Sequence, residues 1–113
     1  PGPYTFLLKA TSVVPRRLMN PKRKTIGVRV PDNNIVRAIL TELGQPIMSS
    51  TLIPPGSRQA LDDAAEIRES YEHDVDLVID GGVCGVEPTT VISLIDGHPE
   101  ILRHGRGETS FLE

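Results

Sequence analysis

The sequence predicts an α/β (α+β) fold in which a twisted, mixed sheet carries flanking helices. Short β-rich segments recur along the 113 residues, and two helical segments interrupt them. Strands at this density, with two helices between them, favour a mixed sheet over a purely parallel one. A chain of this length can bury a core without disulfides or metals. One domain over residues 1–113 is therefore expected.

Six segments rich in β-branched and other apolar residues are predicted to be strands. They are residues 4–10, 25–30, 46–53, 75–79, 90–95 and 101–103. Pro31 stops the second segment, and Gly81 and Gly82 close the fourth, because proline and glycine punctuate regular structure. The third segment follows a helix after about two residues, the short connection typical of alternating α/β units.

Two helices are predicted. Residues 35–43 place their apolar side chains at the spacing of one helical face, with polar residues before them as caps and Gly44 as the stop. A second helix over residues 63–73 begins at Asp63, and Glu66 three residues later resembles a capping box. Its apolar face is thin.

Composition limits the classes of protein to consider. The 12 basic and 15 acidic residues give a net charge of -3, which argues against a broad, sequence-independent grip on nucleic acid. The single cysteine, Cys84, excludes a disulfide framework and fits a reducing compartment such as the cytoplasm. No apolar run long enough for a membrane span occurs, and no signal peptide is indicated. The chain starts at Pro1 and enters a strand at once, so a fragment is expected.

Standard signatures of metal and nucleotide sites are absent from the sequence. His73, His98 and His104 have no spacing that would put two of them on one face, so no metal site is expected. There is no Gly-x-x-x-x-Gly-Lys-Ser/Thr loop and no Gly-x-Gly-x-x-Gly after a strand. No catalytic side chain is predicted, and Cys84 is interpreted as a buried or partly buried spectator thiol.

Hydroxyl and arginine side chains gather at the ends of the predicted strands. Ligands of open α/β sheets tend to lie beyond strand ends, where arginine can clamp a carboxylate or phosphate. An anion site is one interpretation, and ordinary solvated strand ends are the other. The residues concerned are Arg29, Ser49, Ser50, Thr51, Thr89, Thr90 and Arg103.

A basic cluster lies between the first two predicted strands, in a loop or short helix. It consists of Arg16, Arg17, Lys22, Arg23 and Lys24. Such residues can neutralise RNA phosphates and release counterions. No aromatic residue interleaves them to stack bases, so a solvated loop is an equal alternative.

Six motifs in this order resemble the C-terminal portion of the YrdC/YciO family. They are Pro1-Gly2-Pro3-Tyr4-Thr5, the run from Thr25 to Pro31, the run from Pro46 to Thr51, the run from Asp76 to Gly82, the run from Pro88 to Ile92, and Ile101-Leu102-Arg103. The resemblance covers nearly the whole chain. The Lys22-Arg23-Lys24-Thr25 segment, and Leu52-Ile53-Pro54-Pro55-Gly56 in particular, look like the YciO branch.

The resemblance implies a YrdC-like sheet around a concave cavity and a nucleotidyltransferase-type reaction. Well-understood members make threonylcarbamoyl-adenylate from L-threonine, bicarbonate and ATP, with magnesium, for modification of the adenosine next to the anticodon of certain tRNAs. By motif position, Thr25, Thr51 and Arg103 would bind the nucleotide, and Arg29, Ser49 and Thr89 the threonine. The basic cluster would be the candidate RNA contact, with Arg16, Arg17, Arg23 and Lys24 foremost.

Two departures from the family pattern limit what the resemblance implies. Synthase members have Ser-Ala-Asn where this chain has Thr51-Leu52-Ile53, so a hydrocarbon replaces an amide that can donate and accept hydrogen bonds. The family's Lys-x-Arg motif lies upstream of the Pro-Gly-Pro motif with which this chain begins. The chain alone is therefore expected to lack synthase activity. The alternatives are a double-stranded RNA or tRNA-binding module without catalysis, and an interaction domain that kept only the fold.

Overall fold

The computed structural model describes residues 1–112. Its elements, in chain order, are β1 (Tyr4–Lys9), a 3-10 helix (Arg16–Leu18), β2 (Thr25–Val28), α1 (Asn34–Leu43), α2 (Ala64–Tyr71), β3 (Thr90–Ser93), β4 (Glu100–Arg103) and a second 3-10 helix (Ser110–Leu112). The chain forms two compact units. The first comprises Pro1–Met48 and the residues from Pro88 onward, and the second is Ser49–Glu87.

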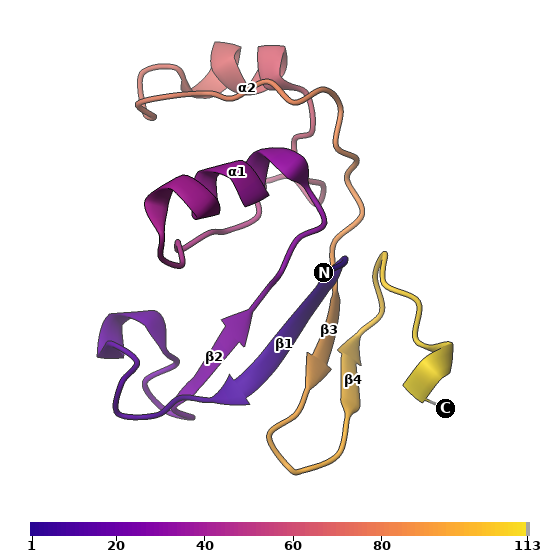
Figure 1. Ribbon diagram of the computed structural model, residues 1–113. Coiled ribbons are helices and arrows are strands. Elements are labelled where there is room, and N and C mark those ends of the chain that lie inside the picture. Colours follow the sequence, from indigo (N-terminus) through magenta and orange to yellow (C-terminus); the bar gives the residue numbers. More distant parts are fainter. Residues whose placement is uncertain (113) are drawn as a thin grey trace. The chain divides into compact units, whose positions relative to one another are not determined.

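The first unit is built on a four-stranded sheet in the order β2-β1-β3-β4 (Figure 1). β1 pairs antiparallel with β2 and parallel with β3, and β3 pairs antiparallel with β4. The register sets Tyr4 opposite Thr90 and Phe6 opposite both Val28 and Ile92. The predicted mixed sheet is therefore confirmed.

The best buried side chains of this unit belong to β3, one of the two central strands of the sheet. Thr90, Ile92 and Ser93 are 0%, 1% and 7% exposed. The Thr90 hydroxyl donates to the Gly107 carbonyl at 2.7 Å and accepts from the Gly105 N–H at 3.1 Å. One buried hydroxyl thus ties the chain that leaves β4 back onto β3.

Tyr4 provides a second attachment for the same C-terminal segment. Its hydroxyl donates to the Glu108 carbonyl at 2.8 Å, and its ring lies 6.0 Å from the ring of Phe6 and 6.0 Å, edge-on, from that of Phe111. A Cβ placed on Gly107 would collide with the Tyr4 ring. Glycine is required at this position because the backbone approaches the aromatic ring too closely for any other residue.

The connection from β1 to β2 is held by a polar turn. The Asn20 side-chain oxygen accepts from the N–H groups of Lys22 and Arg23 at 3.0 and 3.1 Å, and the Lys24 N–H donates to the Asn20 carbonyl at 2.8 Å. Lys24 adopts a left-handed conformation with φ 52°, which closes the turn before β2 begins. The predicted loop or short helix is a 3-10 helix followed by this turn.

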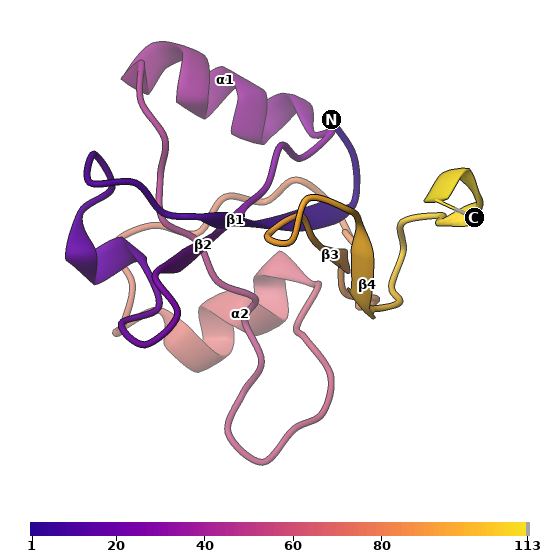
Figure 2. The ribbon, with the colours of Figure 1, turned by 90° about the horizontal axis from the view of Figure 1, so that it is seen from below.

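α1 follows the sequence prediction closely. The Asn33 side chain accepts from the N–H groups of Ile35 and Val36, and Gly44, with φ 72°, ends the helix by donating to the Leu40 carbonyl. Both termini therefore carry the caps that satisfy free backbone groups. The helix lies to one side of the sheet (Figure 2).

The second unit contains α2 as its regular element. The Asp63 side chain caps the helix by accepting from the Ala65 N–H at 2.9 Å, as predicted. The helix ends at Tyr71 rather than near His73, and turns carry the chain on to Asp74. Cys84, predicted to be buried or partly buried, is exposed. Within the described residues, neither helix of the protein is long and apolar enough to cross a membrane.

Two predicted strands are absent from the described structure. Residues 46–53 and 75–79 belong to no strand and join no sheet, and the backbone bends at Asp76. Their composition is that of strands, but a strand also needs a hydrogen-bonded neighbour, and none of the described segments supplies one. The strand predicted over residues 90–95 also ends earlier, at Ser93.

We expect Thr90→Val to lower the free energy of unfolding by about 1–3 kcal/mol, because the Gly105 N–H and the Gly107 carbonyl both lose a buried partner. The urea unfolding midpoint, followed by circular dichroism, measures the change. Thr11→Val is the control, since Thr11 is exposed on a loop. Equal midpoints for the two variants would contradict the role assigned to the Thr90 hydroxyl.

Candidate anion site at one end of the sheet

Polar side chains meet at the end of the sheet where β1 and β3 begin and β4 ends, the upper end in Figure 1. Thr89 directly precedes β3, Arg103 is the last residue of β4, and Thr5 is the second residue of β1. Parallel pairing of β1 with β3 and antiparallel pairing of β3 with β4 bring these three positions together. The site is therefore a product of the topology and not of sequence proximity.

Arg103 is held in place by Thr89. Its Nε and Nη2 donate to the Thr89 carbonyl at 3.0 and 2.9 Å, and Nη2 also donates to the Thr89 hydroxyl at 3.1 Å. A guanidinium carries five N–H donors, and these bonds involve only Nε and Nη2. Arg103 is exposed, so its Nη1 can bind an anion. The orientation of the Arg103 side chain is already set by Thr89.

Thr5 completes this network, and the sequence did not single it out as a site residue. Its hydroxyl lies 2.7 Å from the Thr89 hydroxyl, close enough for one to donate to the other. The sequence feature that could have indicated Thr5 is its membership of the motif that begins with Pro-Gly-Pro. Its partnership with Thr89 follows from the β1–β3 register, where Thr5 is level with Val91.

Arg29 lies at the same end of the sheet as Thr5, and Thr25 does not. Arg29 is the residue after β2, one position beyond the Phe6–Val28 pair, which sets it level with Thr5. Thr25 pairs with Lys9 at the other end of the β1–β2 ladder. At about 3.3 Å per residue, four residues separate Thr25 from Arg29 by about 13 Å.

Ser49 and Thr51 belong to the second unit, where residues 49–53 form extended, exposed chain. The Ser50 hydroxyl contacts the Thr51 carbonyl at 3.4 Å. The sequence-predicted site residues thus divide between the units, with Thr25, Arg29, Thr89 and Arg103 in the first and Ser49 and Thr51 in the second. The roles predicted for these residues stay predictions.

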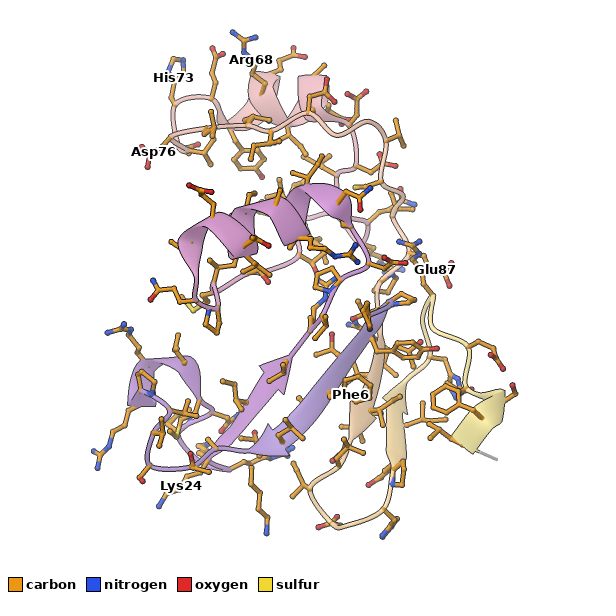
Figure 3. The ribbon with its side chains drawn as sticks, viewed as in Figure 1. Phe6, Lys24, Arg68, His73, Asp76 and Glu87 are labelled. Atoms are coloured by element: carbon orange, nitrogen blue, oxygen red, sulfur yellow. The ribbon has the colours of Figure 1, made fainter. Side chains whose placement is uncertain are left out.

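The basic cluster is fully displayed on the surface of the first unit. Arg16, Arg17, Lys22, Arg23 and Lys24 are all exposed. The ion pairs found among residues 1–112 involve other basic residues, namely Arg37, Arg68 and His73. The cluster therefore keeps its charges available. Figure 3 shows Lys24 at the outer end of the β1–β2 connection.

An apolar hollow occupies the other face of the same strand end. It has a volume of about 270 Å³ and is lined by Pro1, Gly2, Tyr4, Phe6 and Val30. Alternation along β1 puts Tyr4 and Phe6 on the face opposite Thr5.

No group of three or more His, Cys, Asp or Glu side chains in the described part of the chain could hold a metal ion.

We expect Arg103→Lys to destabilise the protein by about 1 kcal/mol, because an ammonium cannot reproduce the forked contact with the Thr89 carbonyl and hydroxyl. The amide resonance of Thr89 should shift in NMR spectra. Arg106→Lys, three residues further along the chain, changes a neighbouring exposed arginine and serves as control. An unmoved Thr89 resonance in Arg103→Lys would rule out the contact.

Comparison with known proteins shows which family this chain resembles. The family model Sua5_yciO_yrdC, described as "Telomere recombination", matches residues 1–105. Escherichia coli YciO is 52% identical over 108 residues, covering 96% of this chain and 52% of the relative. A threonylcarbamoyl-AMP synthase of Neisseria gonorrhoeae is 36% identical over 97 residues, covering 86% of this chain and 49% of the synthase.

Solved structures agree with the sequence comparison. The crystal structure of E. coli YciO superimposes with a TM-score of 0.92 at 50% identity, covering 100% of this chain and 55% of the other. A structure of P. abyssi Sua5 superimposes with a TM-score of 0.80 at 31% identity, covering 93% of this chain and 32% of the other. The chain thus spans about half the length of the curated relatives that it matches.

Proposed function

Since this chain belongs to the Sua5/YciO/YrdC family, with 105 of its residues matched by the family model, we propose that it contributes part of a site for an amino acid and an adenylate, as in threonylcarbamoyl-AMP synthases. The observation that carries the proposal is the exposed guanidinium of Arg103, which is held at the end of the sheet by Thr89, itself hydrogen-bonded to Thr5. Relatives named threonylcarbamoyl-AMP synthase are 30–36% identical to the chain. The activity in the name of these relatives supports threonine and ATP as the ligands.

The chemistry explains why arginines and hydroxyls suffice on the protein's side. In the formation of threonylcarbamoyl-AMP, threonine and bicarbonate give a carbamate. An oxygen of this carbamate bonds to the α-phosphorus of ATP, and the bond from that phosphorus to pyrophosphate breaks. Negative charge develops on the phosphoryl oxygens, which a fixed guanidinium stabilises without reorganising. Hydroxyls orient the reactants, and no side-chain nucleophile is needed. Arg103 is assigned to the phosphate, and Arg29 to the threonine carboxylate.

Magnesium is assigned to the nucleotide. No trio of carboxylate, imidazole or thiol groups among residues 1–112 fits the ion. Magnesium in ATP-using sites is commonly held by the phosphates and by water, with one or two carboxylates. No step is therefore assigned to a metal held by this chain.

The chain alone should bind threonine and the nucleotide weakly and should not catalyse the synthesis of threonylcarbamoyl-AMP. Thr51-Leu52-Ile53 replaces the Ser-Ala-Asn of synthase members, so an amide is lost from the expected nucleotide side. The chain also spans about half of each relative. Binding and turnover therefore test separate parts of the proposal.

We expect AMP and L-threonine at millimolar concentration to shift the amide resonances of Thr89 and Arg103. Arg29→Gln and Arg103→Gln should each weaken binding about tenfold, which is about 1.4 kcal/mol, because each removes a charged donor. Arg106→Gln should bind like the wild type. Equal weakening by Arg106→Gln would rule out the site. Pyrophosphate release by the chain alone from ATP, threonine and bicarbonate would contradict the prediction that it has no synthase activity.

A specific observation supports a second candidate function, the binding of tRNA or double-stranded RNA. Residues 1–31 contain seven lysines and arginines and no acidic residue. Five of the seven form the exposed basic cluster, whose turn is ordered by Asn20. A preordered row of cations costs little entropy on meeting phosphates. Arg16, Arg17, Arg23 and Lys24 are the proposed contacts.

We expect the affinity for tRNA, measured by fluorescence anisotropy, to fall with salt, and the double variant Arg23→Glu/Lys24→Glu to reduce the slope of log K against log salt by about 2. Arg58→Glu/Arg68→Glu, in the second unit, is the matched control because it makes the same charge change at residues that do not belong to the cluster. A slope that responds equally to both double variants would remove the assignment to the cluster.

A further inference from the structure

Thr5, on β1, belongs to the polar network at the end of the sheet, and among residues 1–112 its hydroxyl contacts Thr89 rather than Arg103. The two threonine hydroxyl oxygens lie 2.7 Å apart, and that of Thr89 also accepts from Arg103 Nη2 at 3.1 Å. The three side chains thus form one chain of hydrogen bonds with Thr89 in the middle. Any effect of Thr5 on Arg103 must therefore pass through Thr89.

Strand register places Thr5 and Thr89 on the same face of the sheet. Thr5 is level with Val91 on β3, and level residues of neighbouring strands share a face. Thr89 precedes Val91 by two residues, and alternate residues of a strand also share a face. Tyr4 and Thr90, which are level with each other, belong to the opposite face. The register therefore lets the Thr5 and Thr89 hydroxyls meet.

A β-bulge puts Arg103 on this face as well. The register of β4 shifts by one residue at Leu102, so that Arg103 is level with Val91. In a regular ladder continued from the earlier pairs of β4, Arg103 would be level with Thr90 and would lie on the opposite face. The bulge thus allows the Arg103 guanidinium to reach Thr89.

The methyl group of Thr5 fits beside a glycine on the neighbouring strand β2. A Cβ built on Gly27 would lie 3.4 Å from Thr5 Cγ2, so the methyl group lies toward β2 while the hydroxyl lies toward Thr89. Because the χ1 angle of a β-branched side chain is stiff, this arrangement fixes the direction of the Thr5 hydroxyl.

Hydrogen-bond chemistry limits what the two hydroxyls can offer to a ligand. A guanidinium only donates, so the Thr89 hydroxyl oxygen must accept from Arg103. Each threonine hydroxyl has one proton, and the contact between Thr5 and Thr89 uses one of these two protons, whichever residue donates. The pair therefore keeps one proton for an acceptor oxygen beside the guanidinium, which suits a phosphate or a carboxylate.

We propose that Thr5 is a positioning residue of the candidate anion site, which orients the Thr89 hydroxyl and, through it, Arg103. The role of Thr5 in ligand binding rests on the proposed function, whereas the orientation of Arg103 is a property of the chain itself. Arg103 is exposed, and a long exposed side chain without fixed partners samples many rotamers. A guanidinium fixed before the ligand arrives loses less entropy on binding, so Thr5 should strengthen binding through Arg103.

The test removes the Thr5 hydroxyl and follows Arg103 by NMR. Thr5→Val keeps the shape of the side chain and suits a strand. We expect exchange of the Arg103 Hε proton with water to become about fivefold faster, and AMP to bind about fivefold more weakly, as for the loss of one hydrogen bond. Thr5→Ser keeps the hydroxyl and should behave like the wild type. Thr41→Val is the matched control, because it removes a hydroxyl that donates to the Arg37 carbonyl within α1.

A double variant shows whether Thr5 acts through Thr89. Thr89→Val alone should also speed exchange of the Arg103 Hε proton, because the hydroxyl that accepts from Nη2 is lost. Adding Thr5→Val to Thr89→Val should cause no further increase, since the effects of residues in one hydrogen-bond network do not add.

Each of four results would overturn the proposal. They are an unchanged Arg103 exchange rate in Thr5→Val, exchange in Thr5→Ser as fast as in Thr5→Val, additive effects of Thr5→Val and Thr89→Val, and equal AMP affinity of Thr5→Val and the wild type. If AMP leaves the Arg103 resonances of the wild type unmoved, the proposed function fails instead. The exchange rates then still decide the role of Thr5, because they are measured without a ligand.

Discussion

The parallel pairing of β1 with β3 is the constraint on which the first unit depends. It sets Tyr4 opposite Thr90, two residues from opposite ends of the chain. β3 lies between β1 and β4, and its residues Thr90 and Ile92 are buried. The Thr90 hydroxyl can therefore fasten the segment through Gly107 against the sheet. Loss of this pairing would remove both the core and the polar site at the end of the strands.

The same pairing explains the chemistry of the candidate site. Thr89 precedes the first paired residue of β3, so its hydroxyl meets Thr5, and its carbonyl meets the guanidinium of Arg103. An arginine that is fixed before a ligand arrives loses little further entropy on binding. Orientation of this kind suits a phosphate or carboxylate whose charge must be met in one geometry. The remaining predicted contacts, Ser49 and Thr51, lie in the second unit.

The net charge of -3 conceals a strong segregation of charge along the chain. Residues 1–31 hold seven basic and no acidic residues, whereas residues 49–87 hold nine acidic and two basic ones. The net charge of the whole chain therefore says little about what either region can bind, because screening confines exposed charges to their own neighbourhood. Residues 1–31 can therefore attract a polyanion although the net charge of the whole chain is negative.

By itself, the sequence determined the features that depend on local chemistry. Asn33 and Gly44 cap α1, Asp63 caps α2, and the strands of the mixed sheet lie where β-rich runs predicted them. Residues 46–53 and 75–79 were wrongly predicted as strands, because a strand exists only when another segment pairs with it and composition does not reveal that segment. Only the tertiary structure decided that Thr5 meets Thr89 and that Arg103 is anchored before any ligand binds. Those contacts join residues far apart in sequence, and they follow from strand register, which no local pattern encodes.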